Sequence, residues 1–202
     1  DLREAGAVFV SATAPHFGAG TATDAIPRFT LGEPRPHSAQ RLFARLPELQ
    51  SVDLTTQRTI YQATRGLPGV LRALAFLQGC RRLHGLLSSL VALRLKSGAP
   101  DEYRTAMRDA VFAAVFAELS PEEQRLAATV AAFVGPESNL VARAVSDDPS
   151  GQRLRRLAMA GITESLSLGT ADGRAPRAAV VITAAARAYC LAEGARLNLT
   201  TA

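Results

Sequence analysis

Apolar side chains recur every three or four residues along most of this chain, which is the period of an amphipathic helix. Between residues 37 and 99 this pattern predicts four helices with short joints, which is typical of a small bundle. Ser38 and Asp53 are placed to cap the first two helices, and the fourth ends at Gly98. The apolar positions of the third and fourth helices are Val70, Leu71, Leu74, Leu77, Leu83, Leu86, Leu87, Leu90 and Val91.

The segment Gly66-Leu67-Pro68 joins the second and third of these helices. Gly66 can adopt the positive φ that ends a helix, and Pro68, which has a fixed φ and no N–H, suits the first turn of the next helix. Two helices should therefore meet at a rigid corner, with the proline ring facing whatever lies in front of it. Ordinary helical bundles use the same kind of corner, so the segment does not by itself indicate a ligand.

A second group of helices is predicted after residue 100. It opens with an apolar stripe of four-residue period, formed by Met107, Val111, Val115 and Leu119. The segment Ser120-Pro121-Glu122-Glu123 then has the composition of a helix start, with a capping serine, a proline in the first position and acids in the first turn. Shorter helices are expected over residues 140–145 and 150–160.

Two alternating segments near the C-terminus, residues 164–168 and 178–182, predict β-strands. The residues between them include Asp172-Gly173, a tight-turn signal, so the strands should pair as a hairpin. Thr183 is placed to cap a final helix. Helices, a hairpin and a further helix follow one another in a winged-helix domain, which we expect over residues 100–202.

The first 36 residues have a different pattern. Residues 7–10 form a short apolar run and residues 26–31 alternate, so each predicts a short strand. Two strands without a flanking sheet are marginally stable in water. Residues 1–36 are therefore expected to be the end of a larger α/β domain. Because the remaining segments are mostly helical, we expect the chain as a whole to be mainly α.

Amino-acid composition adds little to the predicted fold class and domain organisation. The 202-residue chain is 48% hydrophobic, enough to bury a core, and no apolar run is long enough to span a bilayer. The chain begins at Asp1, as a fragment would, and shows no signal peptide, so we expect a cytoplasmic location and no membrane partner. The net charge of +5 is carried almost wholly by scattered arginines, which is weak evidence for a nucleic-acid partner.

The histidines and cysteines suggest no reactive site. His16, His37 and His84 share no metal-ligand spacing. Cys80 and Cys190 fit neither a zinc motif nor a redox motif. Both cysteines lie among apolar helical residues, where a buried thiol is expected, and we therefore expect no metal.

Two pairs of adjacent acids also have ordinary explanations. Glu122-Glu123 suits the positive end of a helix dipole, and Asp147-Asp148 suits a loop before Pro149. The chain contains no Gly-x-Ser-x-Gly elbow, and no Ser/His/Asp set can be assembled from it. We therefore expect no enzymatic activity.

Several segments agree in order and spacing with those of one family. Residues 8–13 look like a strand that ends in a phosphate sensor, and residues 29–34 and 39–43 are similar to its L-x-x-L…EA-x-x-LF segment. Residues 66–69 are similar to its Gly-Leu-Pro-Leu corner, and residues 119–126, running into 132–135, to the opening of its winged helix. On these segments the chain resembles the signal-transduction ATPases with numerous domains (STAND or NB-ARC type), which include plant disease-resistance receptors, apoptotic scaffolds and bacterial transcriptional regulators.

The resemblance implies an AAA+-like nucleotide switch. Residues 1–36 would be the end of its α/β nucleotide-binding domain, residues 37–99 its four-helix ARC-like bundle, and residues 100–202 its winged-helix domain. In this family the proline of the Gly-Leu-Pro corner packs on adenine. Gly66, Leu67 and Pro68 are therefore the expected cofactor-binding residues, provided that a nucleotide domain is supplied.

The chain departs from the family where phosphate is bound. It contains no Gly-x-x-x-x-Gly-Lys-Ser/Thr loop. The sensor arginine falls on Thr13, and the Met-His-Asp motif, whose histidine holds the diphosphate, falls on Ile182-Thr183-Ala184. We therefore expect no cofactor on this chain alone, and ATP or ADP only in a longer protein.

The sequence is accordingly interpreted as the regulatory portion of a bacterial signalling or transcriptional regulator. It would relay nucleotide or partner state through an upstream nucleotide-binding domain or another subunit, including within an oligomer. The alternative is a winged-helix DNA-binding module. Its candidate contacts are Arg153, Arg155 and Arg156 on the third helix, with Arg174 and Arg177 at the wing. We favour the first interpretation, because in the family this winged helix packs against the nucleotide domain.

Overall fold

The computed structural model describes residues 40–41, 43–133, 137–138, 148, 150–168 and 177–197. All of these residues belong to one compact unit, residues 33–202. Several predictions lie outside the described residues: the strand-containing segment 1–36, the cap Ser38, the helix over 140–145 and the turn over 169–174.

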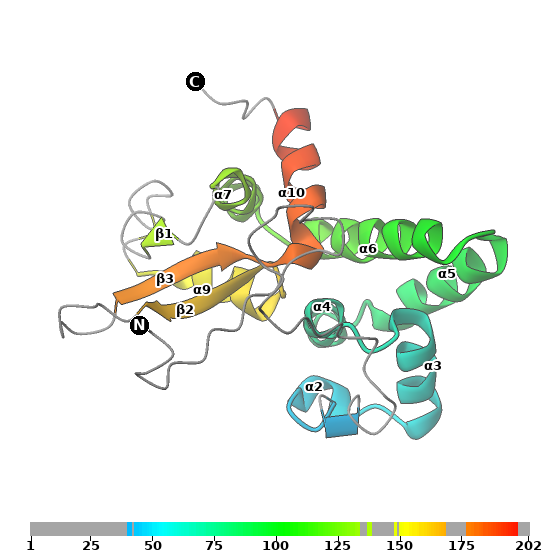
Figure 1. Cartoon of the computed structure of the whole chain (residues 1–202). Coiled ribbons are helices and arrows are strands. Elements are labelled where there is room, and N and C mark those ends of the chain that lie inside the picture. The colour runs from blue at the N-terminus through cyan, green and yellow to red at the C-terminus, as the bar shows by residue number, and fades with distance from the viewer. Residues whose placement is uncertain are drawn as a thin grey trace, which may run out of the picture. The chain divides into compact units, whose positions relative to one another are not determined.

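In its described part the chain is mainly helical and carries a small antiparallel sheet, so the coarse fold class is confirmed (Figure 1). The elements are α2 (Pro47–Gln50), α3 (Leu54–Thr64), α4 (Pro68–Gly79), α5 (Leu83–Lys96), α6 (Pro100–Ala117), α7 (Pro121–Ala132), β1 (Glu137–Ser138), α9 (Gln152–Met159), β2 (Thr163–Leu168), β3 (Arg177–Ile182) and α10 (Ala184–Arg196).

The predicted helix starts are confirmed at two positions. The Asp53 carboxylate accepts a hydrogen bond from the Thr56 backbone N–H at 3.0 Å and so caps α3. Ser120 and Glu123 form a reciprocal capping box at the start of α7, in which each side chain accepts from the other residue's backbone N–H. Local sequence alone determines both of these helix ends.

The corner between α3 and α4 has the predicted backbone. Gly66 has φ = +72°, and Pro68 is the first residue of α4. Helix α3 ends at Thr64, two residues before Gly66, because Arg65 also adopts a left-handed conformation with φ = +53°. Two positive φ values in succession therefore separate the two helices.

Side chains from distant helices hold the C-terminal end of α3. The last turn of a helix leaves carbonyl groups without intrahelical donors. Arg94 of α5 donates to the Gln62 carbonyl at 2.9 Å, and the Tyr103 hydroxyl of α6 donates to the Ala63 carbonyl at 2.7 Å. The corner is therefore fixed by α5 and α6 as well as by its own glycine and proline.

One hydrophobic core runs through the described elements. Helix α6 contacts α3, α4 and α5 on the one hand and α10 on the other (Figure 1). The core is consequently continuous across residues 99 and 100, where the sequence suggested a module boundary. Its members include every residue of the two stripes predicted above: Val70, Leu71, Leu74, Leu77, Met107, Val111, Val115 and Leu119. Val91 is an exception on α5, since 43% of its surface is exposed.

The sheet has the strand order β1–β3–β2. Strands β2 and β3 pair antiparallel from Thr163 opposite Ile182 to Leu168 opposite Arg177, so both predicted strands are confirmed, each beginning one residue early. Strand β1, which the sequence did not predict, pairs with the other edge of β3. The sheet therefore leaves β2 as an edge strand.

Thr183 occupies the predicted N-cap position of α10, but its side chain does not cap the helix. Its hydroxyl donates instead to the Gly161 carbonyl at 2.8 Å, and its backbone N–H donates to the Ile162 carbonyl at 2.8 Å. The prediction of a capping hydroxyl was wrong because a carbonyl from the turn before β2 lies within reach. Thr183 thus fastens α10 to β2.

Candidate functional site

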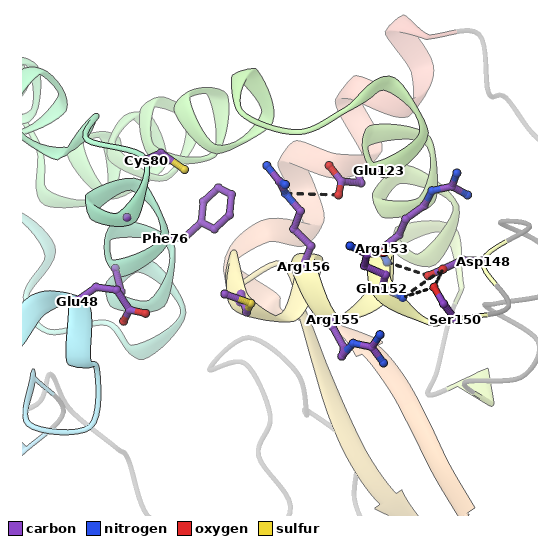
Figure 2. A pocket seen from close by; sticks show the side chains of 13 residues that line it. Glu48, Phe76, Cys80, Glu123, Asp148, Ser150, Gln152, Arg153, Arg155 and Arg156 are labelled. Carbon is purple, nitrogen blue, oxygen red and sulfur yellow. Dashed lines mark hydrogen bonds and ion pairs between the residues drawn. The ribbon is translucent and has the colours of Figure 1, made fainter.

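A groove of about 820 Å³ lies between α2 and α4 on one side and α7 and α9 on the other. Figure 2 shows Phe76 and Glu48 on the first side, with arginines of α9 across from them. The described residues that line it are Glu48, Ala75, Phe76, Gly79, Cys80, Glu123, Asp148, Ser150, Gln152, Arg153, Arg155, Arg156 and Met159. The groove combines an apolar floor with a cationic wall.

Arg156 is held in this wall by three contacts. Its Nε lies 3.4 Å from Glu123 Oε1, and its Nη2 donates to the Glu118 carbonyl at 3.0 Å. Its guanidinium carbon lies 5.8 Å from the centre of the Phe76 ring, within the range of a cation–π contact. Arg156 therefore joins α9 to α4 and α7, and its positive charge is largely compensated by groups of the same molecule.

Asp148 satisfies the first N–H groups of α9. Its carboxylate accepts from the backbone N–H of Gln152 at 3.1 Å and of Arg153 at 2.9 Å, and from the Ser150 hydroxyl at 3.0 Å. Burial raises the pKa of Asp148, but these hydrogen bonds and one from the Leu154 N–H outweigh burial, so the pKa lies below its ordinary value.

The position of Asp148 changes the sequence interpretation of the Asp147-Asp148 pair. The sequence suggested a loop acid, whereas the structure makes Asp148 the cap of α9. The first N–H groups of α9 are consequently satisfied by a side chain of the same molecule.

The arginines predicted to contact DNA do not form one free surface. Arg155 is exposed and has no hydrogen bond or ion pair in the part of the chain that the structure describes. Arg153 is half-buried and lines the groove with Arg156. Arg174 lies outside the described residues, as does the side chain of Arg177. The structure thus brings Arg153, Arg155 and Arg156 together on α9, and the Arg156 guanidinium is bound by other residues of the same chain.

The residues expected to face adenine lie elsewhere. Gly66 is buried, Leu67 is half-buried and Pro68 is exposed at the start of α4. At the residue after Pro68, a Cβ atom on Gly69 would lie 3.1 Å from the Cβ of Ala185, the second residue of α10. The corner therefore adjoins the start of α10.

Sequence analysis missed Glu48, Phe76 and Met159 as members of a common groove. Phe76 fitted the apolar pattern of α4, and Met159 the end of α9, so neither carried a functional signal. Met159 is 63% exposed, because it lies five residues after Leu154 and two after Leu157, off the helical stripe that these two buried residues form. Only the packing of α9 beside α4 reveals the groove.

Within the described residues, no group of three or more histidine, cysteine, aspartate or glutamate side chains could hold a metal ion. The same residues include no helix that combines the length and apolar character needed to cross a membrane. No family model, no curated protein and no solved structure matches this chain.

Proposed function

We propose that this chain is the regulatory portion of a STAND-type, NB-ARC-like ATPase of a bacterial signalling or transcriptional regulator. Residues 37–99 would be its helical bundle and residues 100–202 its winged-helix-like module, following the end of a nucleotide-binding domain at residues 1–36. The chain relays nucleotide or partner state by a change of conformation and carries out no catalysis itself.

The observation that carries this proposal is the contact between Gly69 and Ala185. In the resembled family the Gly-Leu-Pro proline packs on adenine and the histidine of the Met-His-Asp motif holds the diphosphate, so both segments lie near one nucleotide. In this chain the corresponding segments are far apart in sequence, yet a Cβ at Gly69 would stand 3.1 Å from the Ala185 Cβ. This proximity is what a common nucleotide would require.

The packing of α4 supports a relay. Helix α4 begins at the corner and contacts α6, α9 and α10. A movement imposed on the corner would therefore act directly on elements of the second module. Interfaces packed this closely have discrete arrangements and do not deform continuously, which is the property that a switch uses.

Calorimetry tests the part of the proposal that concerns phosphate. Titration of this chain alone with ADP and with ATP, each in the presence of Mg²⁺, is expected to give no binding heat, because the chain has no phosphate-binding loop. Micromolar binding by the isolated chain would contradict this part of the proposal.

The reading frame upstream of Asp1 tests the proposal that a nucleotide-binding domain precedes this chain. We expect a phosphate-loop motif roughly one hundred residues before Asp1, since that is the usual size of such a domain. A start codon directly before Asp1 would contradict the proposal of a larger switch and would favour a stand-alone adaptor.

DNA binding is the second candidate, and the exposed side chain of Arg155 on α9 is the observation that favours it. Fluorescence anisotropy with duplex DNA over a salt series distinguishes the two functions. Binding that falls steeply with salt, and that Arg155→Ala weakens, would support DNA recognition. Arg156 already pairs with Glu123, so we expect no binding at low salt.

A further inference from the structure

Among the residues that the structure describes, the outer edge of β2 carries backbone groups without hydrogen-bond partners. The Ile162 carbonyl accepts from the Thr183 N–H at 2.8 Å, so these two residues form a hydrogen-bonded pair. In an antiparallel ladder such pairs alternate with pairs that do not exchange hydrogen bonds. Glu164 is therefore bonded to Val181, and the N–H and C=O of Ser165 point away from β3. No described residue pairs with that edge.

A second groove of about 420 Å³ follows this edge. Its described lining is Leu46, Glu48, Arg72, Ala75, Phe76, Ala158, Met159, Thr163, Glu164 and Ser165. It shares Glu48, Ala75, Phe76 and Met159 with the first groove, so the two grooves adjoin each other. We call the two together the α4–β2 channel. The channel leads from the strand edge, past an apolar floor, to the arginines of α9.

Two features of the channel indicate an unfilled binding surface. Met159 is 63% exposed within it, and its flexible thioether suits an apolar side chain of a partner. In the described part of the chain, the outer edge of β2 has no partner strand and is therefore a template for another strand.

The charges in the channel restrict the partner. Glu123 pairs with Arg156, Asp148 caps α9, and Glu164 lies 3.8 Å from Arg72. The exposed arginine without such a partner is Arg155, which lies at the α9 end. Glu48 is exposed near the apolar floor. An acidic side chain is therefore favoured at the α9 end and disfavoured beside α2.

We propose that the α4–β2 channel binds an extended segment of a partner protein by strand addition to β2. The segment bonds to the backbone of Ser165, places an apolar side chain over Phe76 and Met159, and directs an acidic side chain toward Arg155. Main-chain hydrogen bonds would supply part of the affinity. The apolar and acidic side chains of the segment would supply the specificity, as in other strand-addition complexes. This inference does not depend on the proposed nucleotide switch.

The test is selection from a display library of random peptides about ten residues long, the upper end of the usual strand length. We expect the chain to enrich peptides with an apolar residue followed or preceded by aspartate or glutamate. A fluorescein-labelled copy of the most enriched peptide is then titrated against variants by anisotropy. Absence of enrichment, or enrichment of basic peptides, would overturn the proposal.

Two substitutions at Ser165 separate backbone from side-chain recognition. Ser165→Pro removes the outward N–H and keeps the β2–β3 ladder, because that N–H is not bonded to β3. We expect it to weaken peptide binding about tenfold or more, whereas Ser165→Ala binds as the unmodified chain does. Equal binding by both variants, with unchanged thermal melting, would refute strand addition.

The charge is tested by Arg155→Ala, with Arg58→Ala on α3 as the matched control. Both arginines are exposed and have no hydrogen bond or ion pair in the described residues, and Arg58 lies outside the channel. Only Arg155→Ala should weaken the peptide. Light scattering tests whether a second copy of this chain occupies the channel instead. A dimer that the substitution Ser165→Pro dissociates would show that it does, and would overturn the proposal.

Discussion

Gly161 and Gly69 pack backbone against backbone, so closely that a Cβ atom at Gly161 would stand 2.8 Å from the Gly69 carbonyl oxygen. Gly161 also has φ = +72°, which other residues rarely adopt. The substitution Gly161→Ala therefore combines backbone strain with a clash. We expect it to lower the free energy of unfolding by about 2–4 kcal/mol, measured by urea denaturation.

The matched control for this change is Gly85→Ala on α5. A Cβ atom there meets nothing within 4 Å, and the position is helical. Alanine should raise the free energy of unfolding by about 0.5–1 kcal/mol, because it restricts the unfolded chain. If Gly161→Ala and Gly85→Ala both had the same unfolding free energy as the unmodified chain, the result would contradict the close approach of Gly161 to α4.

Tyr103 provides a test of the corner between α3 and α4. Its hydroxyl donates to the Ala63 carbonyl at 2.7 Å, across a long separation in sequence. Tyr103→Phe should cost about 0.5–1.5 kcal/mol of unfolding free energy, since it leaves that carbonyl without its donor. Chemical denaturation of the purified variant measures the change.

Tyr189 serves as the control for Tyr103. It is also half-buried and packs edge-on against Phe116 with ring centres 5.2 Å apart, but its hydroxyl has no hydrogen bond in the described part of the chain. Tyr189→Phe should leave stability nearly unchanged. A larger loss from Tyr189→Phe than from Tyr103→Phe would contradict the hydrogen bond at the corner.

Asp148 should make stability depend on pH. Its pKa is lowered in the folded state, so its carboxylate stabilises the fold above the unfolded pKa of about 3.9. That contribution is lost as the pH falls through the lowered folded pKa. The unfolding free energy of the unmodified chain should exceed that of Asp148→Asn by about 0.3–1 kcal/mol at neutral pH, and the difference should shrink in acid.

Asp109→Asn is the control for this pH series. Asp109 is exposed on α6 and has no hydrogen bond or ion pair in the described residues. Its variant should have nearly the same unfolding free energy as the unmodified chain at neutral pH. A difference between the unmodified chain and Asp148→Asn that stayed constant from neutral to strongly acidic pH would show that the Asp148 charge does not stabilise α9.

The two cysteines should differ in reactivity. Cys190 is buried in the core, and burial raises its pKa to about 12. Cys80 is half-buried and lines the first groove, where burial and then Glu118 raise its pKa. With a thiol reagent at pH 8, Cys80 should react slowly and Cys190 only on unfolding. Cys80→Ser should abolish the slow reaction, and rapid labelling of that variant when folded would contradict the burial of Cys190.

Local structure could be predicted from the sequence where neighbouring residues decide it. The cap at Asp53 and the capping box at Ser120 depend on residues within one turn, and the structure contains both. Burial of the stripe that begins at Met107 follows from helical periodicity in the same way. Which helices that stripe would contact could not be predicted, because periodicity specifies a face and not its neighbours.

The candidate site depended on contacts that the sequence does not encode locally. Thr183 has the position of a cap, but its hydroxyl is taken by the distant Gly161 carbonyl. Asp148 caps α9 from outside the usual N-cap position. Phe76 and Met159 meet in one groove only because α4 and α9 pack together. Predicting such sites requires the tertiary arrangement first.

Helix α6 has a consequence for how this chain can evolve. It packs against α3, α4 and α5 and also against α10, so residues 37–99 and 100–202 bury their apolar side chains on the same helix. A substitution that changes the packing of α6 therefore alters the fit for both halves at once. The residues tolerated in one half therefore depend on those already present in the other, and recombination at residue 100 would pair faces that were not selected together.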